Sequence, residues 1–394
     1  MGDAERPSWR CLSLYAADHG GVVDGAAVIG VPSPAFTEVT PKLEAAMKKF
    51  GSTLASVVLA LVVLVSAEVQ AKAGEIKSIA ILVPEQGTDF GWNQQGVDAA
   101  RSVAKKYHLD FIPVEGLGYG DIRPTLRELA ADGVSLLIVH ANGYVESGVE
   151  VAQEMKVPIA ITGRPQAILP GLIADYTVTG HEGAYLAGVL AAKMTRTGTL
   201  GIVVSGEPVP WNAQSAGFAM GAKATRPDIK IVYAVIGPAA FADVAGGRRV
   251  AELAISAGAD IIFGQGDGSS FGMLEAVETK RAVDGGNVWF IDVIGDKSSV
   301  DKGHLLTSVV WDLEPIYSKL VEDVRDGKFG TRAFRLSLAD NSVRLLKTSH
   351  IPEPVWTEVM AMRDKIVSGS VSVPEVTDAR KVRALVSALE AAPQ

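Results

Sequence analysis

The stretch that decides the fold runs from Ile76 to Val114 and reads IKSIAILVPEQGTDFGWNQQGVDAARSVAKKYHLDFIPV. Its apolar run from Ser78 to Val83 has the length and the β-branched content of a buried strand. Residues Asn93 to Tyr107 then place apolar side chains three and four positions apart, as an amphipathic helix does, and Asp110 to Val114 is a second candidate strand. Strand, helix and strand in this order predict a parallel βαβ unit.

The same alternation continues along the chain and then begins again near Gly183. Two doubly wound lobes of similar size are therefore predicted, each with a parallel sheet covered on both faces. The first series has further strands at 136–140, 159–162 and 172–176 and helices at 123–131 and 145–155. The second series has helices at 183–194, 213–224, 244–257 and 273–281 and strands at 201–204, 230–235, 261–263 and 288–291.

The elements after residue 299 are too few to form a third lobe. A strand at 305–309, a helix after Glu314, a strand at 343–346 and a helix at 355–367 are interpreted as the chain returning to complete the first lobe. The expected boundaries are thus 72–178 with 299–394 for the N-terminal lobe, and 179–298 for the C-terminal lobe. Repeated crossing between lobes would create a hinge. The tail after Pro374 has the pattern of an amphipathic surface helix.

A secretory leader is predicted at residues 47–71. Met47 is followed by two lysines, an apolar run from Leu54 to Val65 and the small residues of Val69-Gln70-Ala71. Export would then release a periplasmic protein beginning at Lys72, and residues 1–46 are interpreted as an upstream extension without ordered structure. The alternative is a single membrane-spanning helix, but the apolar run is shorter than the ~20 residues that a span requires, so stable membrane insertion is not expected.

Composition excludes several other classes of protein. The 394 residues carry a net charge of −8, with a pI near 5.4, and no stretch gathers Lys and Arg as a nucleic-acid surface does. The only cysteine, Cys11, precedes the leader, so the exported chain needs no disulfide and has no lipoprotein anchor. No cofactor is expected, and no group of His, Cys, Asp and Glu has the spacing of metal ligands.

Ligands of open parallel sheets lie beyond the carboxyl ends of the strands, so the loops there are the candidate site. The loop after the first strand offers the carboxylate of Asp89, the rings of Phe90 and Trp92, and the amide of Asn93. A flat, hydrogen-bonding small molecule suits this combination. The alternative is that Asp89 caps the following helix and Trp92 packs inward. The third strand ends at His140, interpreted as a local hydrogen-bonding residue, and is followed by Asn142.

The loops of the second lobe repeat the combination of aromatic and polar side chains. Trp211 and Phe241 supply rings, and Asp267 and Asp292 supply carboxylates. Rings from two lobes stacking on both faces of a ligand, with polar groups at its edge, would fit a planar heterocycle. The alternative is that each aromatic side chain belongs to the ordinary core.

The segment from Gly264 to Gly272 invites an enzymatic alternative. Gly268, Ser270 and Gly272 match the G-x-S-x-G pattern of serine hydrolases, with Asp292 or Asp296 and then His304 or His350 downstream. Such short patterns arise often by chance in glycine-rich loops, and the hydrolase fold has a single lobe. As a dinucleotide-binding fingerprint the segment fails, because its third glycine is misplaced. An enzyme is therefore not expected.

Four stretches together resemble the basic membrane protein family, the substrate-binding proteins of ABC transporters related to purine nucleoside receptors. The similarity extends from Ile76 to about Val324 and implies a type I periplasmic binding fold whose lobes close on a ligand. The stretches are 89–96, GAYLAGVLAAKM at 183–194, GFAMGA at 217–222 and GADIIFG at 258–264.

The resemblance also implies roles for individual residues. The family's Asp-x-x-Phe-Asn element falls on Asp89, Trp92 and Asn93, so that Trp92 replaces the stacking phenylalanine. Its Phe-x-Asp falls on Phe241 and Asp243. Its Gly-Val-Asp-x-Asp-Gln region is only loosely matched by 292–297, with Ile294 where the first aspartate belongs. Its lysine after the Leu-Thr-Ser strand is Trp311 here.

These observations lead to one hypothesis with alternatives. The chain is predicted to capture a purine-like solute in the periplasm and deliver it to the permease subunits of an ABC importer. Because Trp311 would fill the space that a ribose needs, a base should be preferred over its nucleoside. The alternatives are a receptor or sensor for a sugar or another small molecule on the same fold, and the serine hydrolase. A transcriptional regulator is disfavoured, since an export signal precedes the first strand.

Overall fold

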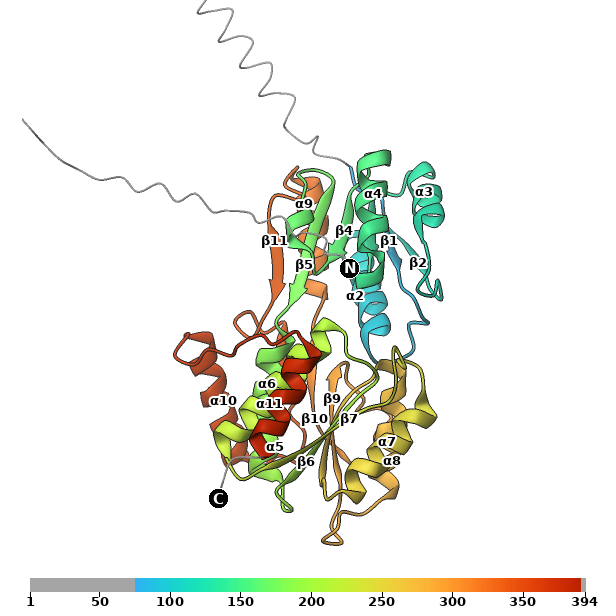
Figure 1. Cartoon of the computed structure of the whole chain (residues 1–394). Coiled ribbons are helices and arrows are strands. Elements are labelled where there is room, and N and C mark those ends of the chain that lie inside the picture. Colours follow the sequence, from blue (N-terminus) through green and yellow to red (C-terminus); the bar gives the residue numbers. More distant parts are fainter. Residues whose placement is uncertain (1–74, 391–394) are drawn as a thin grey trace, which may run out of the picture. The chain divides into compact units, whose positions relative to one another are not determined.

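The computed structural model describes residues 75–390, which form two α/β lobes (Figure 1). Each lobe is built on one six-stranded sheet, so the predicted fold class is confirmed. The predicted leader at 47–71, its cleavage site before Lys72 and the upstream extension 1–46 lie outside the described residues.

The first sheet is entirely parallel and is covered by helices on both faces. In β1, Ile79 and Ile81 share a core with α2, whereas Ala80 and Leu82 belong to the core under α3 and α4. This burial on both faces explains the uninterrupted apolar run. The strand order is β11-β5-β4-β3-β1-β2, with β1 (Ser78–Leu82), β2 (Asp110–Val114), β3 (Leu136–Val139), β4 (Ile159–Thr162), β5 (Ile173–Val178) and β11 (Ala333–Leu336). The helices are α2 (Trp92–Tyr107), α3 (Arg123–Ala131), α4 (Val145–Met155) and α9 (Glu314–Arg325).

The second sheet repeats this arrangement, with one antiparallel strand at its edge. Helices α7 and α8 pack together on one face, and α5 and α6 lie on the other, where α10 and α11 cover them (Figure 1). The strand order is β12-β10-β9-β8-β6-β7, with β6 (Thr199–Val204), β7 (Lys230–Val235), β8 (Ile261–Gln265), β9 (Trp289–Ile294), β10 (Leu305–Trp311) and β12 (Val343–Leu345). The helices are α5 (Gly180–Met194), α6 (Val209–Thr225), α7 (Val244–Ser256), α8 (Ser270–Thr279), α10 (Glu353–Val367) and α11 (Ala379–Glu390).

The predicted lobe boundary after residue 299 is wrong for most of that segment. Strand β10 was expected in the first lobe, but it pairs with β9 and β12 in the second sheet, and α10 and α11 pack on helices of the second lobe. Only α9 and β11 return to the first lobe. An apolar run specifies a buried strand but not its neighbours, because pairing partners are chosen by contacts distant in sequence. The surface helix predicted after Pro374 is present as α11.

The chain crosses between the lobes after β5, after β10 and after β11, which confirms a hinge with several crossovers. Hydrogen bonds tie these segments to one another. Thr179 donates through its backbone N–H and its hydroxyl to the carbonyl of Leu336, at 3.0 and 2.9 Å. The N–H of Asp312 donates to the carbonyl of Ser342 at 2.7 Å.

The family-like stretches at 183–194 and 217–222 form the contact between α5 and α6. A Cβ added at Gly188 would lie 2.1 Å from the carbonyl oxygen of Phe218, and one added at Gly221 would lie 2.0 Å from that of Tyr185. Only glycine allows the two helix backbones to approach this closely. These motifs therefore specify packing inside the second lobe rather than a binding site.

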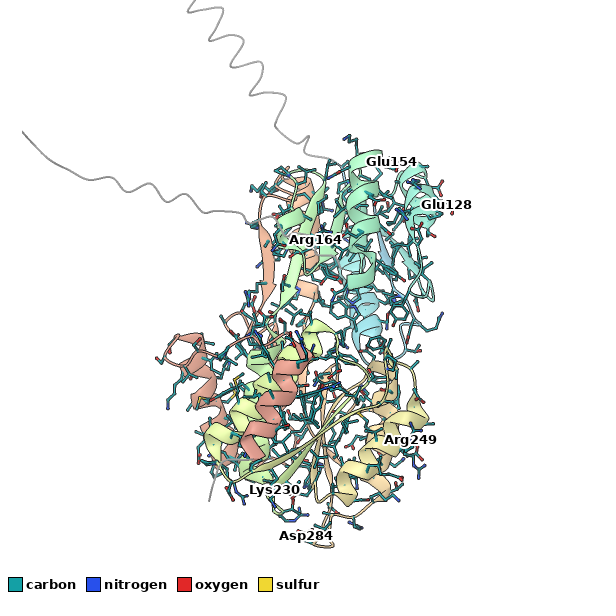
Figure 2. The ribbon with its side chains drawn as sticks, in the orientation of Figure 1. Glu128, Glu154, Arg164, Lys230, Arg249 and Asp284 are labelled. Carbon is teal, nitrogen blue, oxygen red and sulfur yellow. The ribbon has the colours of Figure 1, made fainter. Side chains whose placement is uncertain are left out.

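Charged side chains lie mainly on the outer surfaces of both lobes (Figure 2). Glu154 pairs with Arg127 at 2.8 Å, and Asp284 pairs with Arg196 at 2.9 Å, all four side chains being between 38% and 49% exposed. Exposed pairs of this kind contribute little to stability. The apolar cores on the two faces of each sheet therefore hold the lobes together.

Candidate functional site

The loop between β1 and α2 is organised around the buried carboxylate of Asp89. Its Oδ1 accepts from the backbone N–H groups of Gly91 and Gln94, both at 2.9 Å. Its Oδ2 accepts from the backbone N–H of Asn93 at 3.2 Å and from the Asn93 side chain at 2.7 Å. Asp89 thus satisfies the N–H groups of Asn93 and Gln94, two of the free N–H groups at the start of α2. Asp89 and Asn93 were predicted to contact the ligand edge, and in this structure their local partners hold the loop that carries Trp92.

Trp92 is fixed against the end of β3 by His140. The two rings stack at 3.7 Å with an interplanar angle of 13°, and the indole N–H donates to the backbone carbonyl of His140 at 2.8 Å. The imidazole Nε2 donates to the carbonyl of Trp92 at 2.9 Å, while Nδ1 lies 2.7 and 2.8 Å from the hydroxyls of Tyr176 and Tyr317. Burial lowers the pKa of His140 to about 3, so the ring is neutral. One face of Trp92 is therefore covered, and a ligand can stack only on the other.

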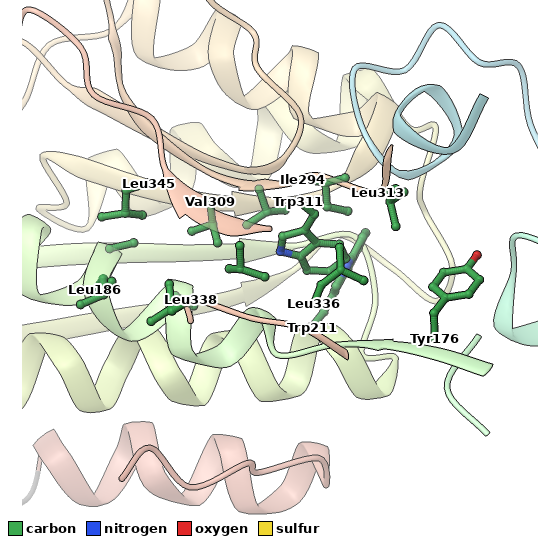
Figure 3. Packing of buried hydrophobic residues seen from close by; sticks show 14 of the residues in the cluster. Tyr176, Leu186, Trp211, Ile294, Val309, Trp311, Leu313, Leu336, Leu338 and Leu345 are labelled. Atoms are coloured by element: carbon green, nitrogen blue, oxygen red, sulfur yellow. The ribbon is translucent and has the colours of Figure 1, made fainter. Parts of the chain in front are cut away.

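Trp311 lies at the carboxyl end of β10, among buried apolar side chains (Figure 3). It meets Trp92 edge to face at 5.9 Å. It is only 3% exposed. A Cβ at Gly180, the first residue of α5, would lie 2.6 Å from the indole and 3.2 Å from the amide carbon of Gln214. The indole N–H and the Gln214 Oε1 both have no hydrogen-bond partner within residues 75–390. Trp311 therefore fills the space beside the hinge and brings an unused donor to it.

In the second lobe, Phe241 is the centre of an aromatic group. Trp211 meets it edge to face at 5.2 Å, and Tyr119 from the first lobe lies 5.9 Å away at an angle of 34°. Tyr119 also donates to Glu85 at 3.2 Å. Sequence reasoning missed this tyrosine, although it follows β2 in a glycine-rich segment of the kind that carries binding residues. The structure thus opposes Phe241 with Tyr119 rather than with Trp92.

Phe241 also lines a cavity of about 570 Å³ at the carboxyl ends of β6 and β7. The volume lies within the range of small-molecule sites. Most of the wall is apolar, and Glu207 and Arg383 are the charged residues in it. The complete lining is Gly206, Glu207, Pro208, Val235, Gly237, Pro238, Ala239, Phe241 and Arg383.

The lobes touch where Asp267 meets the start of α2. Its Oδ1 accepts from the backbone N–H of Trp92 at 3.1 Å, and a Cβ at Gly91 would lie 2.6 Å from the same oxygen. Burial, and next the charge of Asp89, raise the pKa of Asp267 to about 8. The backbone is left-handed at Asp267 (φ 45°) and at Phe90 (φ 51°), both on this junction. Non-glycine residues pay a conformational cost there, and such residues cluster at functional sites.

Lys297 makes a second contact between the lobes. Sequence reasoning gave this lysine no role of its own and included it only in the region 292–297 that loosely matches the family. Its ammonium donates to the carbonyl of Phe90 at 3.2 Å and to Asp292 at 2.5 Å, and both charged side chains are fully buried. Burial raises the pKa of Asp292, and the charge of Lys297 opposes this rise. The other carboxylate oxygen of Asp292 has no partner in the described part of the chain. Phe271 packs edge to face on Phe90 at 5.8 Å and lies under the ammonium.

Asn142 is exposed at the start of a short 3-10 helix, Asn142–Tyr144, and no contact joins it to the other predicted site residues in the described structure. The hydrolase constellation is likewise not assembled. Ser270 is 1% exposed, His304 bonds the carbonyl of Val288 at 2.8 Å, and His350 packs on Trp289. Between residues 75 and 390, no three His, Cys, Asp or Glu side chains gather to hold a metal ion.

Two α/β lobes joined by several crossings, with a cavity of small-molecule size at the carboxyl ends of β6 and β7, are the arrangement of a two-lobed solute-binding protein. The model of the Bmp family, described as ABC transporter substrate-binding protein PnrA-like, matches residues 76–377, and the chain belongs to this family. The family consists of solute-binding proteins rather than enzymes, which excludes the hydrolase. The resemblance drawn from the sequence is thus confirmed.

Two named relatives and a solved structure are similar to this chain. The ABC transporter nucleoside-binding protein BmpA of Lactococcus lactis is 24% identical, covering 83% of this chain and 99% of its own. A purine-binding protein of Brucella abortus is 27% identical, covering 72% and 79%. A solved ABC transporter solute-binding protein from Conexibacter woesei has a TM-score of 0.65 at 23% identity, covering 77% of this chain and all of its own. None of the helices described between residues 75 and 390 is both long and apolar enough to cross a membrane.

Proposed function

We propose that this chain is the periplasmic receptor of an ABC importer and captures a purine-like solute between its lobes for delivery to the permease subunits. Membership of the substrate-binding family supports the transport role. The names of the relatives from Lactococcus lactis and Brucella abortus support nucleosides or purines as the ligand class. The predicted leader at 47–71 supports the periplasmic location.

The observation that carries the proposal is the cavity beside Phe241 in the second lobe, together with the contact that Phe241 makes with Tyr119 of the first lobe. Phe241 lines about 570 Å³ of space, with Trp211 at its edge and Tyr119 opposite it from the other lobe. Offset stacking on aromatic faces favours flat heterocycles. A ring on Phe241 would be enclosed when Tyr119 and the exposed face of Trp92 approach from the first lobe, and the buried oxygens of Asp267 and Asp292 are candidates for its polar edge.

The preference within the purine class rests on Trp311. The family resemblance implies a lysine at this position, whose ammonium would donate to sugar hydroxyls. An indole has one donor and a far larger volume, and here it is packed between Trp92 and Gly180. A ribose would have to displace it. We therefore propose that the free base binds at least about tenfold more tightly than its nucleoside, or roughly 1.4 kcal/mol.

Titration calorimetry tests both parts of the proposal. The purified chain is titrated with adenine, guanine and hypoxanthine, and then with adenosine, guanosine and inosine. Binding of the bases with dissociation constants at least tenfold lower supports the proposal. Tighter binding of the nucleosides overturns the role of Trp311 and leaves the receptor in place, whereas the absence of binding by all six compounds overturns the purine ligand.

A further inference from the structure

The cavity beside Phe241 has one charged donor in its wall, and this donor comes from the tail helix. Arg383 lies on α11, which begins at Ala379, whereas the family model ends at residue 377. The other lining residues belong to the loops that follow β6 and to β7 with the loop after it. A segment beyond the shared family region thus completes the cavity of this chain.

The guanidinium of Arg383 is held in a defined orientation. Its Nε donates to Oε1 of Glu207 at 2.9 Å and its Nη2 pairs with Oε2, an arrangement that fixes the plane of the group. Glu207 is held in turn, because the Tyr233 hydroxyl donates to it at 3.2 Å. The Asn212 side chain donates to the carbonyls of Glu207 and Thr377, each at 2.9 Å, and so joins this loop to the tail.

The helix behind Arg383 is also anchored. Val382 is fully buried and Val386 is 4% exposed, and α11 packs on α6 and β7. The Arg383 side chain itself is 57% exposed. Its position is therefore set by the backbone and by Glu207, while more than half of the side-chain surface remains exposed beside the cavity. Such a preorganised donor loses little side-chain entropy when it binds.

We infer that Arg383 is a specificity-determining residue that donates to an oxygen on the ligand, so that 6-oxopurines are preferred over adenine. A guanidinium has five N–H donors and no acceptor, and the pair with Glu207 uses one on Nε and one on Nη2. A carbonyl oxygen of hypoxanthine can accept from the remaining donors. The exocyclic amine of adenine is a donor and cannot.

The same pair argues against an anionic ligand. Glu207 neutralises the charge of Arg383, and no other cation lines the cavity formed by the described residues. A carboxylate or phosphate would therefore meet a donor without net positive charge. A neutral carbonyl group on a flat ring, stacked on Phe241, fits these walls better. This inference rests on the proposed function, because it assumes that the ligand is a purine.

The test compares Arg383→Gln with a matched control, Arg380→Gln, one turn earlier on the same helix. Arg380 pairs with Asp378 at 3.0 Å, is 91% exposed and is not part of the cavity wall. Titration calorimetry of the full chain is carried out with hypoxanthine and with adenine. We expect Arg383→Gln to weaken hypoxanthine binding about tenfold, as the loss of a charge-assisted hydrogen bond does, and to change adenine binding less than about twofold.

Two further measurements make each outcome decisive. Arg383→Lys keeps the charge but loses the planar donor pair, so it should recover less than half of the lost preference; thermal melting shows that each variant is folded. Equal effects of Arg383→Gln and Arg380→Gln on hypoxanthine would overturn the inference while leaving the purine receptor intact. If the unmodified chain binds none of the six purine compounds, the proposed purine ligand fails, and the inference fails with it; if it binds only the nucleosides, the same comparison is made with inosine and adenosine.

Discussion

The two halves of the site differ in how their buried polar groups are satisfied. On the first lobe, the carboxylate of Asp89, the ring nitrogens of His140 and the indole N–H of Trp92 all have partners within that lobe. On the second lobe, within the described residues, Ser205 Oγ, Gln214 Oε1, Ser270 Oγ, Asp292 Oδ1 and Trp311 Nε1 are buried without partners. An unsatisfied buried polar atom is costly unless water or a ligand supplies the missing bond.

This contrast suggests a division of labour between the lobes. The first lobe presents a rigid aromatic surface that needs nothing from the ligand to be stable. The second lobe has these unpaired polar atoms near the carboxyl ends of β6, β9 and β10, where a ligand is expected in an open parallel sheet. Stacking would then supply general affinity for flat molecules, and the second lobe would supply selection among them.

The largest expected effect comes from a substitution that keeps the two lobes apart. A Cβ at Gly295, after β9, would lie 1.9 Å from the carbonyl oxygen of Phe90, and its nearest neighbours all belong to the first lobe. Gly295→Ala should therefore prevent closure without disturbing the fold of the second lobe. We expect purine affinity to fall by about a hundredfold or more, since a ligand held by one lobe loses half its contacts.

Small-angle scattering with and without ligand, together with calorimetry, measures this effect. Gly143→Ala is the matched control, because a Cβ there meets no described atom within 4 Å and the residue is exposed. Unchanged affinity in Gly295→Ala would mean that the ligand does not need the closed contact at Phe90, and the comparison of two cooperating half-sites would not hold.

The second prediction concerns the anchor of the first lobe. Trp92→Ala removes the ring that stacks on His140 and leaves the imidazole face open. Loss of a stacking surface costs roughly 0.5–1.5 kcal/mol beyond the buried area, so we expect affinity to fall about tenfold for all purines alike. Trp92→Phe, which keeps a ring, should recover most of it. A change in the order of preference among purines would contradict the assignment of selection to the second lobe.

The sequence predicted the architecture better than the site, because its recognisable motifs determine how helices pack. The glycines at 188 and 221 mark a close helix contact, so a family resemblance built on them reports packing. The pattern also specified α11, because Val382 and Val386 lie four residues apart on one face. Local pattern could not show that β10 pairs with β9, since strand pairing depends on distant residues.

Sequence reasoning could propose site residues in the loops that follow strands. It could not predict the role of a residue when that role depends on which side chains it contacts. Sequence reasoning assigned Asp89 and Trp92 to the ligand site, yet four hydrogen bonds to Asp89 give it a local role at the start of α2, and this depends on side-chain direction. Tyr119 and Arg383 were missed because each comes to Phe241 from a remote segment. Exposed residues of such segments carry no periodic signal that would single them out.

The smallest expected effect concerns the contact between the two lobes at Asp267. This carboxyl lies near Asp89, Glu85 and Lys297, and its pKa is raised to about 8 where the lobes touch, chiefly by burial and then by Asp89. A raised carboxyl pKa means that closing takes up a proton, so closure is favoured at low pH. The advantage is lost as the pH rises from about 4 through the raised pKa. We expect ligand affinity to be lower at pH 8 than at pH 6, and the fall for one proton cannot exceed about tenfold per pH unit.

Asp267→Asn should flatten this dependence, because an amide is permanently uncharged and its oxygen can still accept from the N–H of Trp92. At pH 8 the variant should then bind more tightly than the unmodified chain, and the difference should shrink as the pH falls toward about 4. Asp132→Asn, at the exposed end of α3, serves as the control and should follow the unmodified chain. Calorimetry across this pH range decides the matter: a dependence that persists in Asp267→Asn would assign the proton to another group, such as Glu85, whose pKa is also raised by burial. The group that takes up the proton would then belong to the first lobe, and the second lobe would no longer supply all the polar groups that select the ligand.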